Sequence, residues 1–404
     1  KSGVPNAIKV AKEMEARGEW FTPRFPDGHL RANKPLLSYW MVTGGFRLLG
    51  VGPAGSRLLF LLAGALTILV TAAIGRRATG DPRTGTAAAA LFAGSSAVIA
   101  VSSRANPDAP LMLGLALLLW GTLRLRQDPT DRPAPWLIWL GAGLGVAAKL
   151  ALGLVGLLFA ALFLAFAPGR RTRLARLLAP APLLAGTCLA AIALLPLYLA
   201  NAGGAAQAVR DQVGGRLAAD LPAVAANLLR YLLDPLRHFL PFSLAALLAV
   251  LFIPRARLSL RRPWVRLALA WTALLLVIFA LGNLHRSRYL LPAYPLLAVL
   301  VAAPLVRALA LRPRWLLRLC RGVIVLAAAA GLTVAVLLYR IPLHAAYPAL
   351  LGAGAILLFV LGRRRPHLAL PAAGCAWLLG MLAATAAIRA ATFATPVPEI
   401  LERL

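Results

Sequence analysis

The stretch that decides the fold is Trp136–Ala167, with the sequence WLIWLGAGLGVAAKLALGLVGLLFAALFLAFA. Its 32 residues contain a single charge, Lys149, close to the middle. One continuous helix of this length would extend roughly 48 Å, whereas the hydrocarbon core of a bilayer is about 30 Å thick. If the stretch instead forms two short helices that meet at Lys149, each helix fits within the bilayer and the ammonium lies at the membrane surface. The stretch therefore predicts a helical membrane protein.

The remainder of the chain has the same character. Of its 404 residues, 60% are hydrophobic, and the mean hydropathy is +0.78, whereas soluble domains are usually about 45–50% apolar. Apolar runs of about 18 residues or more recur, and each is long enough to cross a bilayer as a helix. We expect an all-α polytopic membrane protein with about twelve transmembrane helices and no soluble domain. The expected spans are approximately 58–75, 86–102, 109–123, 136–148, 150–167, 177–200, 238–253, 264–282, 290–309, 321–339, 345–362 and 368–388.

The formal charge of +30 is a topology signal rather than a sign of nucleic-acid binding. Arginines are concentrated in short loops on one side of the predicted spans, and short loops of this kind face the cytoplasm. Some contact with anionic membrane lipids follows from the same charges. The opposite, extracytoplasmic side receives ten of the thirteen acidic residues. We therefore expect the chemistry on that side, and no nucleic-acid partner.

The first residues form a polar outer segment. Ala7–Arg17 has apolar residues at helical spacing and predicts a short amphipathic helix on the outer face. Leu36–Leu49 is apolar but too short and interrupted to span, so we expect it to lie along the interface, as we do for a helix at Leu221–Leu233. The predicted division is an extracytoplasmic loop with interfacial helices at 1–57, a transmembrane core at 58–309 that includes the outer loop 201–237, and C-terminal helices with a short tail at 310–404.

Asp108 opens a predicted span directly after Asn106-Pro107, and it is the only acid between Asp27 and Asp211 on the outer side. A carboxylate at a helix start can simply accept backbone N–H bonds as a cap. However, a charge at the membrane boundary is costly and often marks a site. Arg104 lies nearby in the sequence. We favour a catalytic role for Asp108, with Arg104 in support.

Lysine is rare in this chain, with five Lys among 43 basic residues. Lys34 and Lys149 both lie at predicted membrane junctions. A compact ammonium suits a phosphate, and the alternative for each is an interfacial cation whose stem lies along apolar surface. We favour phosphate binding for Lys34, which precedes Pro35. For Lys149 both interpretations stay open.

His285, Arg286, Arg288 and Tyr289 lie immediately before a predicted span. Two arginines and a tyrosine at a helix start can hold a phosphate or pyrophosphate through charge-assisted hydrogen bonds. The alternative is an interfacial belt of arginine and tyrosine. Because arginine is otherwise sparse on the outer side, we favour the phosphate clamp.

Two further features give little information by themselves. Asp211 and Arg216 are five residues apart in the outer loop, and most such charges are solvated. Cys188, Cys320 and Cys375 lie inside apolar spans, where small packing residues are expected. No Cys/His spacing in the sequence predicts a zinc site.

Four motifs occur in a recognisable order: Asn33-Lys34-Pro35-Leu36, Arg104 followed by Asp108-Ala109-Pro110, the Lys149 junction, and Arg288-Tyr289-Leu290-Leu291-Pro292. In this order they resemble the GT-C membrane glycosyltransferases of the glycosyltransferase family 39 type. That family includes the lipid A aminoarabinose transferases and the protein O-mannosyltransferases. The likeness covers roughly residues 7–305.

The resemblance implies a GT-C-like bundle that transfers a sugar from a polyprenyl-phosphate donor to a lipid or protein acceptor. Transfer would take place on the extracytoplasmic face of a bacterial plasma membrane. The resemblance also implies that Asp108 is the site acid and that Lys34, Arg216 and Tyr289 contact the donor phosphate. Asp211 would take the place of a metal ligand, which makes a divalent metal the candidate cofactor.

The sequence also departs from the family pattern. Asn33 stands where the family usually has Glu, and Leu36 replaces a second Pro. The junction has the sequence Lys149-Leu150-Ala151 rather than Lys-Gly-Pro. The family's first helix and its Asp-Glu pair have no counterpart, so we expect that the chain is truncated upstream of Lys1.

Three other functions are compatible with a polytopic chain. A transporter or lipid flippase would carry charges or broken helices near mid-membrane, whereas the charges here lie at the ends of predicted spans. An O-antigen ligase or polymerase would share the polyprenyl-linked donor. A non-catalytic scaffold would tolerate alanine at Lys34 or Asp108.

Overall fold

The computed structural model describes residues 6–31, 35–200, 220–282, 285–311, 314–338 and 368–379. Over these residues the chain is helical without a β-strand, apart from one isolated bridge between Arg24 and Leu30. The predicted all-α class is therefore confirmed.

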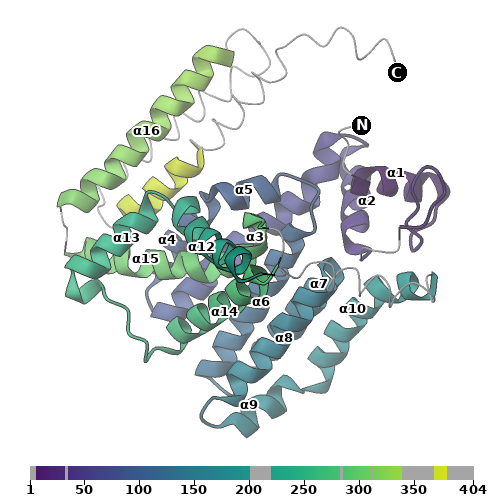
Figure 1. Ribbon diagram of the computed structural model, residues 1–404, viewed down its shortest axis with the longest axis horizontal. Coiled ribbons are helices and arrows are strands. Elements are labelled where there is room, and N and C mark those ends of the chain that lie inside the picture. The colour runs from purple at the N-terminus through teal and green to yellow at the C-terminus, as the bar shows by residue number, and fades with distance from the viewer. Residues whose placement is uncertain are drawn as a thin grey trace.

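The described helices follow one another along the whole chain (Figure 1). The first part comprises α1 (Asn6–Arg17), α2 (Leu37–Leu49), α3 (Pro53–Thr79), α4 (Pro82–Ala93), α5 (Ser96–Ser102), α6 (Asp108–Gln127), α7 (Pro133–Ala148), α8 (Leu150–Ala165), α9 (Arg170–Leu177) and α10 (Pro180–Ala200). The second part comprises α12 (Leu221–His238), α13 (Phe242–Phe252), the 3-10 turn η2 (Pro254–Ala256), α14 (Pro263–Ala280), the 3-10 turn η3 (Ser287–Ala293), α15 (Tyr294–Ala310) and α16 (Arg314–Leu338).

Four of the described helices are long and apolar enough to cross a membrane, and up to seven spans result if each bent helix pair is one span. Three shorter apolar helices, α7, α8 and Ala369–Leu379, add to these. The chain is thus an integral membrane protein. The predicted number of about twelve spans stays a prediction, because the expected span 345–362 lies outside the described residues.

The sequence prediction for Trp136–Ala167 is confirmed. Helix α7 ends at Ala148 and α8 begins at Leu150, with Lys149 between them in an extended conformation (φ −152°, ψ 96°). The two helices pack closely because glycines face each other: a Cβ on Gly145 would lie 3.1 Å from the Cα of Gly153.

Two predicted spans are wrong as single straight helices. The span 86–102 breaks between α4 and α5, which are inclined at 65°. The break falls at Gly94-Ser95, and such pairs are a common cause of kinks. The span 238–253 begins four residues later than predicted, since α12 continues to His238 and then meets α13 at 96°. Pro241, just before α13, lacks the N–H that would continue a helix.

The centre of the molecule is α6. Most of α6 is buried, whereas fewer than half of the residues in the apolar parts of α3 and α14 are buried. Exposed leucines such as Leu62, Leu66 and Leu69 on α3 suit a surface that faces lipid. Helices α7 and α8 pack against α6, with α10 beside α7, while α3, η3 and α14 contact α6 elsewhere on its surface (Figure 1).

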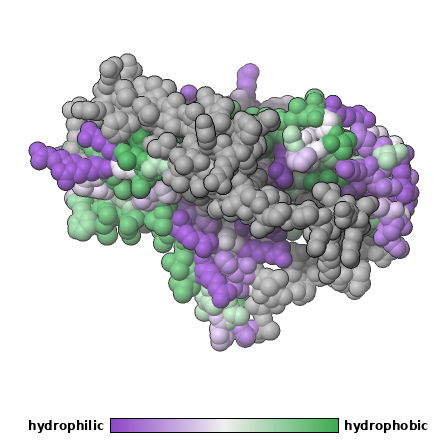
Figure 2. Space-filling model, turned by 90° about the horizontal axis from the view of Figure 1, so that it is seen from above, coloured by the Kyte–Doolittle hydropathy of each residue, from purple (hydrophilic) through white to green (hydrophobic). Residues whose placement is uncertain are grey.

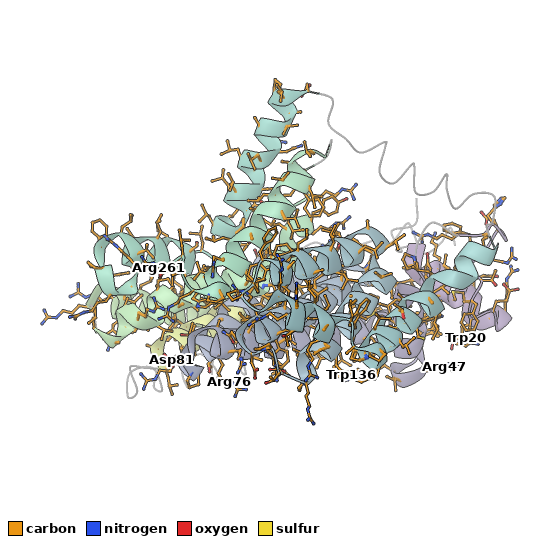
Figure 3. The ribbon with its side chains drawn as sticks, turned by 90° about the horizontal axis from the view of Figure 1, so that it is seen from below. Trp20, Arg47, Arg76, Asp81, Trp136 and Arg261 are labelled. Atoms are coloured by element: carbon orange, nitrogen blue, oxygen red, sulfur yellow. The ribbon has the colours of Figure 1, made fainter. Side chains whose placement is uncertain are left out.

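The N-terminal segment forms a separate polar layer. Helix α1 confirms the amphipathic helix predicted at Ala7–Arg17, and its Val10 and Met14 pack against Tyr39 of α2. The Arg47 guanidinium lies 4.3 Å above the ring of Trp20 (Figure 3). Figure 2 shows hydrophilic colour gathered over this segment, with hydrophobic areas beside it.

Candidate functional site

The site begins at the first residue of α6. Asp108 is 3% exposed, and the cap position before it is Pro107. The Asp108 carboxylate accepts its hydrogen bond from the side chain of Lys149, and a second cation, Arg288, lies near its other oxygen. The capping role considered from the sequence is therefore wrong, since the carboxylate turns toward two cations rather than toward backbone amides.

The α7–α8 junction brings Lys149 to this carboxylate. Helix α7 packs along α6, so the end of α7 lies at the level where α6 begins. The Lys149 ammonium bonds to Oδ1 of Asp108 and lies 5.3 Å from the centroid of the Tyr289 ring. A cation over an aromatic face is attracted by the ring. The side chain of Lys149 keeps 28% of its surface exposed, so it can still meet a ligand.

The η3 turn brings the second cation. The Nε of Arg288 lies 3.5 Å from Oδ2 of Asp108, and both atoms are buried without a hydrogen-bond partner among the described residues. The Arg288 side chain is 40% exposed. Tyr289 is held by its ring contact with Phe279 of α14, at a centroid distance of 5.1 Å.

The structure thus brings together Asp108, Lys149 and the pair Arg288-Tyr289, which come from three separate parts of the sequence and were predicted to converge. Arg104 is exposed in the turn before α6 and forms no hydrogen bond or ion pair with Asp108. Three other predicted site residues, Lys34, Asp211 and Arg216, lie outside the described residues.

His285 and Arg286 turn away from Asp108 toward α12. The Nε2 of His285 lies 2.8 Å from Oδ2 of Asp234, and its ring lies 4.5 Å from that of Tyr231. The backbone N–H of Arg286 donates to the hydroxyl of Tyr231 at 3.0 Å. The segment 285–289 is therefore held on both sides by a buried carboxylate, Asp234 on α12 and Asp108 on α6.

Asp234 is the functional candidate that sequence analysis missed. It is 4% exposed and also bonds to Arg237 at 3.0 Å, while Nδ1 of His238 lies 2.6 Å from the hydroxyl of Tyr294. The signal lay in the spacing: Tyr231, Asp234 and His238 are three and four residues apart, which places them on one helix face.

That polar face of α12 is buried, while its leucines are exposed. Leu228, Leu229, Leu232, Leu233 and Leu236 range from 37% to 58% exposed. This is the reverse of the pattern in a soluble protein, and it suits a helix whose outer face meets lipid. A helix is present where Leu221–Leu233 predicts one, and it extends to His238, while its interfacial position stays a prediction.

Within the described residues, no group of three or more His, Cys, Asp or Glu side chains could hold a metal ion. Asp211, the predicted metal ligand, lies outside them, so that role stays a prediction. Cys320 is buried, as expected for a packing residue, whereas Cys188 is exposed on α10.

Comparison with known proteins agrees with the sequence prediction. Residues 33–199 match the family described as dolichyl-phosphate-mannose-protein mannosyltransferase. An uncharacterised protein of Aquifex aeolicus is 27% identical over 72% of this chain and 56% of its own length. An undecaprenyl phosphate-alpha-4-amino-4-deoxy-L-arabinose arabinosyl transferase of Pseudomonas aeruginosa (strain PAO1) is 31% identical over 36% of this chain and 28% of its own length.

Two crystal structures of ArnT from Cupriavidus metallidurans share the fold. The apo structure superposes with a TM-score of 0.67 at 22% identity, over 99% of this chain and 75% of that one. The structure bound to undecaprenyl phosphate gives a TM-score of 0.69 at 20% identity, over 99% and 76%. This chain spans about half, or less, of the length of the curated relatives that it matches.

Proposed function

We propose that this chain is a glycosyltransferase of the GT-C, family 39 type, because residues 33–199 match the dolichyl-phosphate-mannose-protein mannosyltransferase family and the chain shares the fold of ArnT. Its donor is a sugar carried on a polyprenyl phosphate, and its acceptor is a lipid or a protein. Transfer takes place on the extracytoplasmic face of the bacterial plasma membrane. The observation that carries the proposal is the convergence of Lys149 and Arg288 on the buried Asp108.

The charges of this cluster suit a phosphate. The formal charges of Asp108, Lys149 and Arg288 sum to +1, which matches the single negative charge of a phosphodiester-linked sugar. Both cations keep exposed surface, at 28% and 40% of their side chains, so they can reach a headgroup. Cations placed where negative charge develops stabilise the transition state.

The proposed reaction is one displacement at the anomeric carbon. An oxygen of the acceptor bonds to that carbon while the bond from the carbon to the phosphate oxygen breaks. The polyprenyl phosphate leaves with the electron pair, and a carboxylate takes the proton of the acceptor. Lys149 and Arg288 offset the charge that grows on the leaving phosphate, together with Lys34 and Arg216.

The role of Asp108 follows from its contacts. One oxygen bonds to Lys149 and the other faces Arg288. This geometry supports Asp108 as the group that holds both cations in place, ahead of the role of proton acceptor. Tyr289 contributes through its ring, which lies beneath the Lys149 ammonium.

The test uses the full chain in vesicles with a labelled polyprenyl-phosphate sugar. We expect label in a lipid or protein product, and a loss of about 100-fold or more for Lys149→Ala and Arg288→Ala, as when one transition-state donor is removed. Arg230→Ala is the matched control, because this arginine of α12 is exposed and its side chain forms no hydrogen bond or ion pair with a described residue. Equal transfer by all four proteins would overturn the proposal.

The same experiment separates a transferase from a transporter or flippase. A flippase moves the intact labelled lipid between leaflets and leaves the sugar on its phosphate. A transferase separates the two, so free polyprenyl phosphate accumulates with the product. Movement of intact donor without sugar loss would favour the flippase. Chain growth on the donor lipid itself would favour a polymerase.

A further inference from the structure

A groove lies at the opposite end of α6 from Asp108. It has a volume of about 430 Å³ and opens between the ends of α6, α8 and α14. Its lining residues are Arg126, Phe163, Phe166, Arg266, Leu269 and Ala270. Since α6 has 20 residues, the groove is about 30 Å from the candidate site. It is therefore a separate feature, on the membrane face that carries the short arginine-rich loops.

The groove holds two cations without counter-ions. The guanidiniums of Arg126 and Arg266 make no hydrogen bond or ion pair with any described side chain. Arg173 and Arg266 are both close enough to Arg126 to repel its charge. Arg173 is itself used structurally, since it donates to the backbone carbonyls of Leu125, Arg126 and Pro168.

The nearest acids along the chain are already engaged. Asp131 pairs with Arg124 at 2.9 Å and with Arg77 at 3.8 Å. Asp128 accepts hydrogen bonds from the amide and hydroxyl of Thr130. An anion from outside the chain is thus the natural partner of the two groove arginines.

The wall of the groove is apolar and open. Phe166 is 86% exposed and Leu269 is 45% exposed. Deeper in the bundle the same helices touch, because the rings of Phe159 and Trp271 lie 5.0 Å apart between centroids. The groove therefore offers charge at the helix ends and an apolar surface directly beside it.

We propose that this groove binds one phospholipid whose headgroup is an anionic phosphate. The phosphate lies between Arg126 and Arg266, and an acyl chain covers Phe166 and Leu269. Basic pockets between helices on the cytoplasmic side of a membrane suit such headgroups. Free phosphate shares the charge but would leave the aromatic wall uncovered, so the lipid is the better occupant.

Native mass spectrometry of the detergent-solubilised full chain tests the proposal, with phosphatidylglycerol, phosphatidylcholine or inorganic phosphate as probes. We expect one phosphatidylglycerol per chain. Arg126→Gln/Arg266→Gln should bind it about 30-fold more weakly, since each basic side chain contributes about a fivefold factor. Arg83→Gln/Arg261→Gln removes the same charge from exposed positions outside the groove and should bind like the wild type; Arg261 is labelled in Figure 3.

Arg126 is half-buried, so the double variant requires a check that it folds. Arg266→Glu changes an exposed residue and should also lose the lipid. Unchanged binding by Arg266→Glu, or an equal loss in the control pair, would overturn the site. Equal retention of phosphatidylcholine would overturn the anionic preference. Retention of inorganic phosphate at the same strength without lipid would overturn the lipid as occupant. None of these results depends on sugar transfer.

Discussion

Replacing Asp108 by Asn tests the centre of the candidate site. The carboxylate is 3% exposed, and its loss leaves Lys149 and Arg288 facing a neutral amide. Removing one partner of a fully buried ion pair costs about 3–5 kcal/mol. Here the cations keep 28% and 40% of their side-chain surface in contact with the surroundings. We therefore expect a smaller loss of unfolding free energy, about 2–3 kcal/mol.

A second substitution separates the structural part of this effect from the chemical part. In Asp108→Asn/Lys149→Met the unpaired ammonium is removed as well, so about 1–2 kcal/mol of the lost stability should return. Sugar transfer should not return, because the double variant lacks a cation that the proposal places at the donor phosphate. Between the single and the double variant, stability should therefore recover in part while activity stays low.

Unfolding in a detergent titration, followed by circular dichroism, gives the stability, and transfer from the labelled donor gives the activity. Asp128→Asn is the control, since this half-buried carboxylate at the other end of α6 accepts hydrogen bonds only from Thr130 among the described residues, and the change should have little effect. The reasoning is refuted if Asp108→Asn is as stable as the wild type. It is also refuted if the effects of the two substitutions simply add.

Asp234→Asn should loosen the segment that carries Arg288, so we expect the KM for the donor to rise about tenfold while kcat changes less. A loss in kcat with an unchanged KM would argue against a positioning role. Gly153→Val should prevent accumulation of folded protein in membranes, because the added side chain meets the backbone of α7; Gly322→Val, with open space around it, should accumulate normally. Burial raises the pKa of Tyr39 in α2 to about 12. The neutral hydroxyl therefore makes its full contribution to the unfolding free energy below about pH 10, and this contribution is lost as the pH rises through about 12. Tyr39→Phe should make the unfolding free energy less dependent on pH in this range.

The sequence predicted the helical class and the turn at Lys149 because hydrocarbon thickness limits helix length. It also predicted that Asp108, Lys149 and Tyr289 lie on one face, since alternation of spans determines which ends meet. It did not predict that Lys149 is the direct partner of Asp108. Two residues at one membrane face can be neighbours or can lie far apart, and only helix packing decides between these.

The network around Asp234 shows a different limit. An amphipathic helix in a soluble protein buries its apolar face and leaves its charged face to solvent. In a membrane protein lipid can cover the leucines, and the polar face can then be the buried one. Periodicity identifies the two faces of α12 equally well in both cases but does not say which one is inside.

The packing of α6 on α7 has a mechanical consequence. A Cβ on Gly114 would lie 2.7 Å from the carbonyl oxygen of Gly141, and one on Gly121 would lie 2.7 Å from that of Ala134. Because the two backbones are this close, no layer of side chains lies between them that could slide, and the helix pair moves as one rigid body. Among the described elements that carry the cluster, the η3 turn with Arg288 is not part of this helix pair, so it is the element that can adjust to an incoming headgroup.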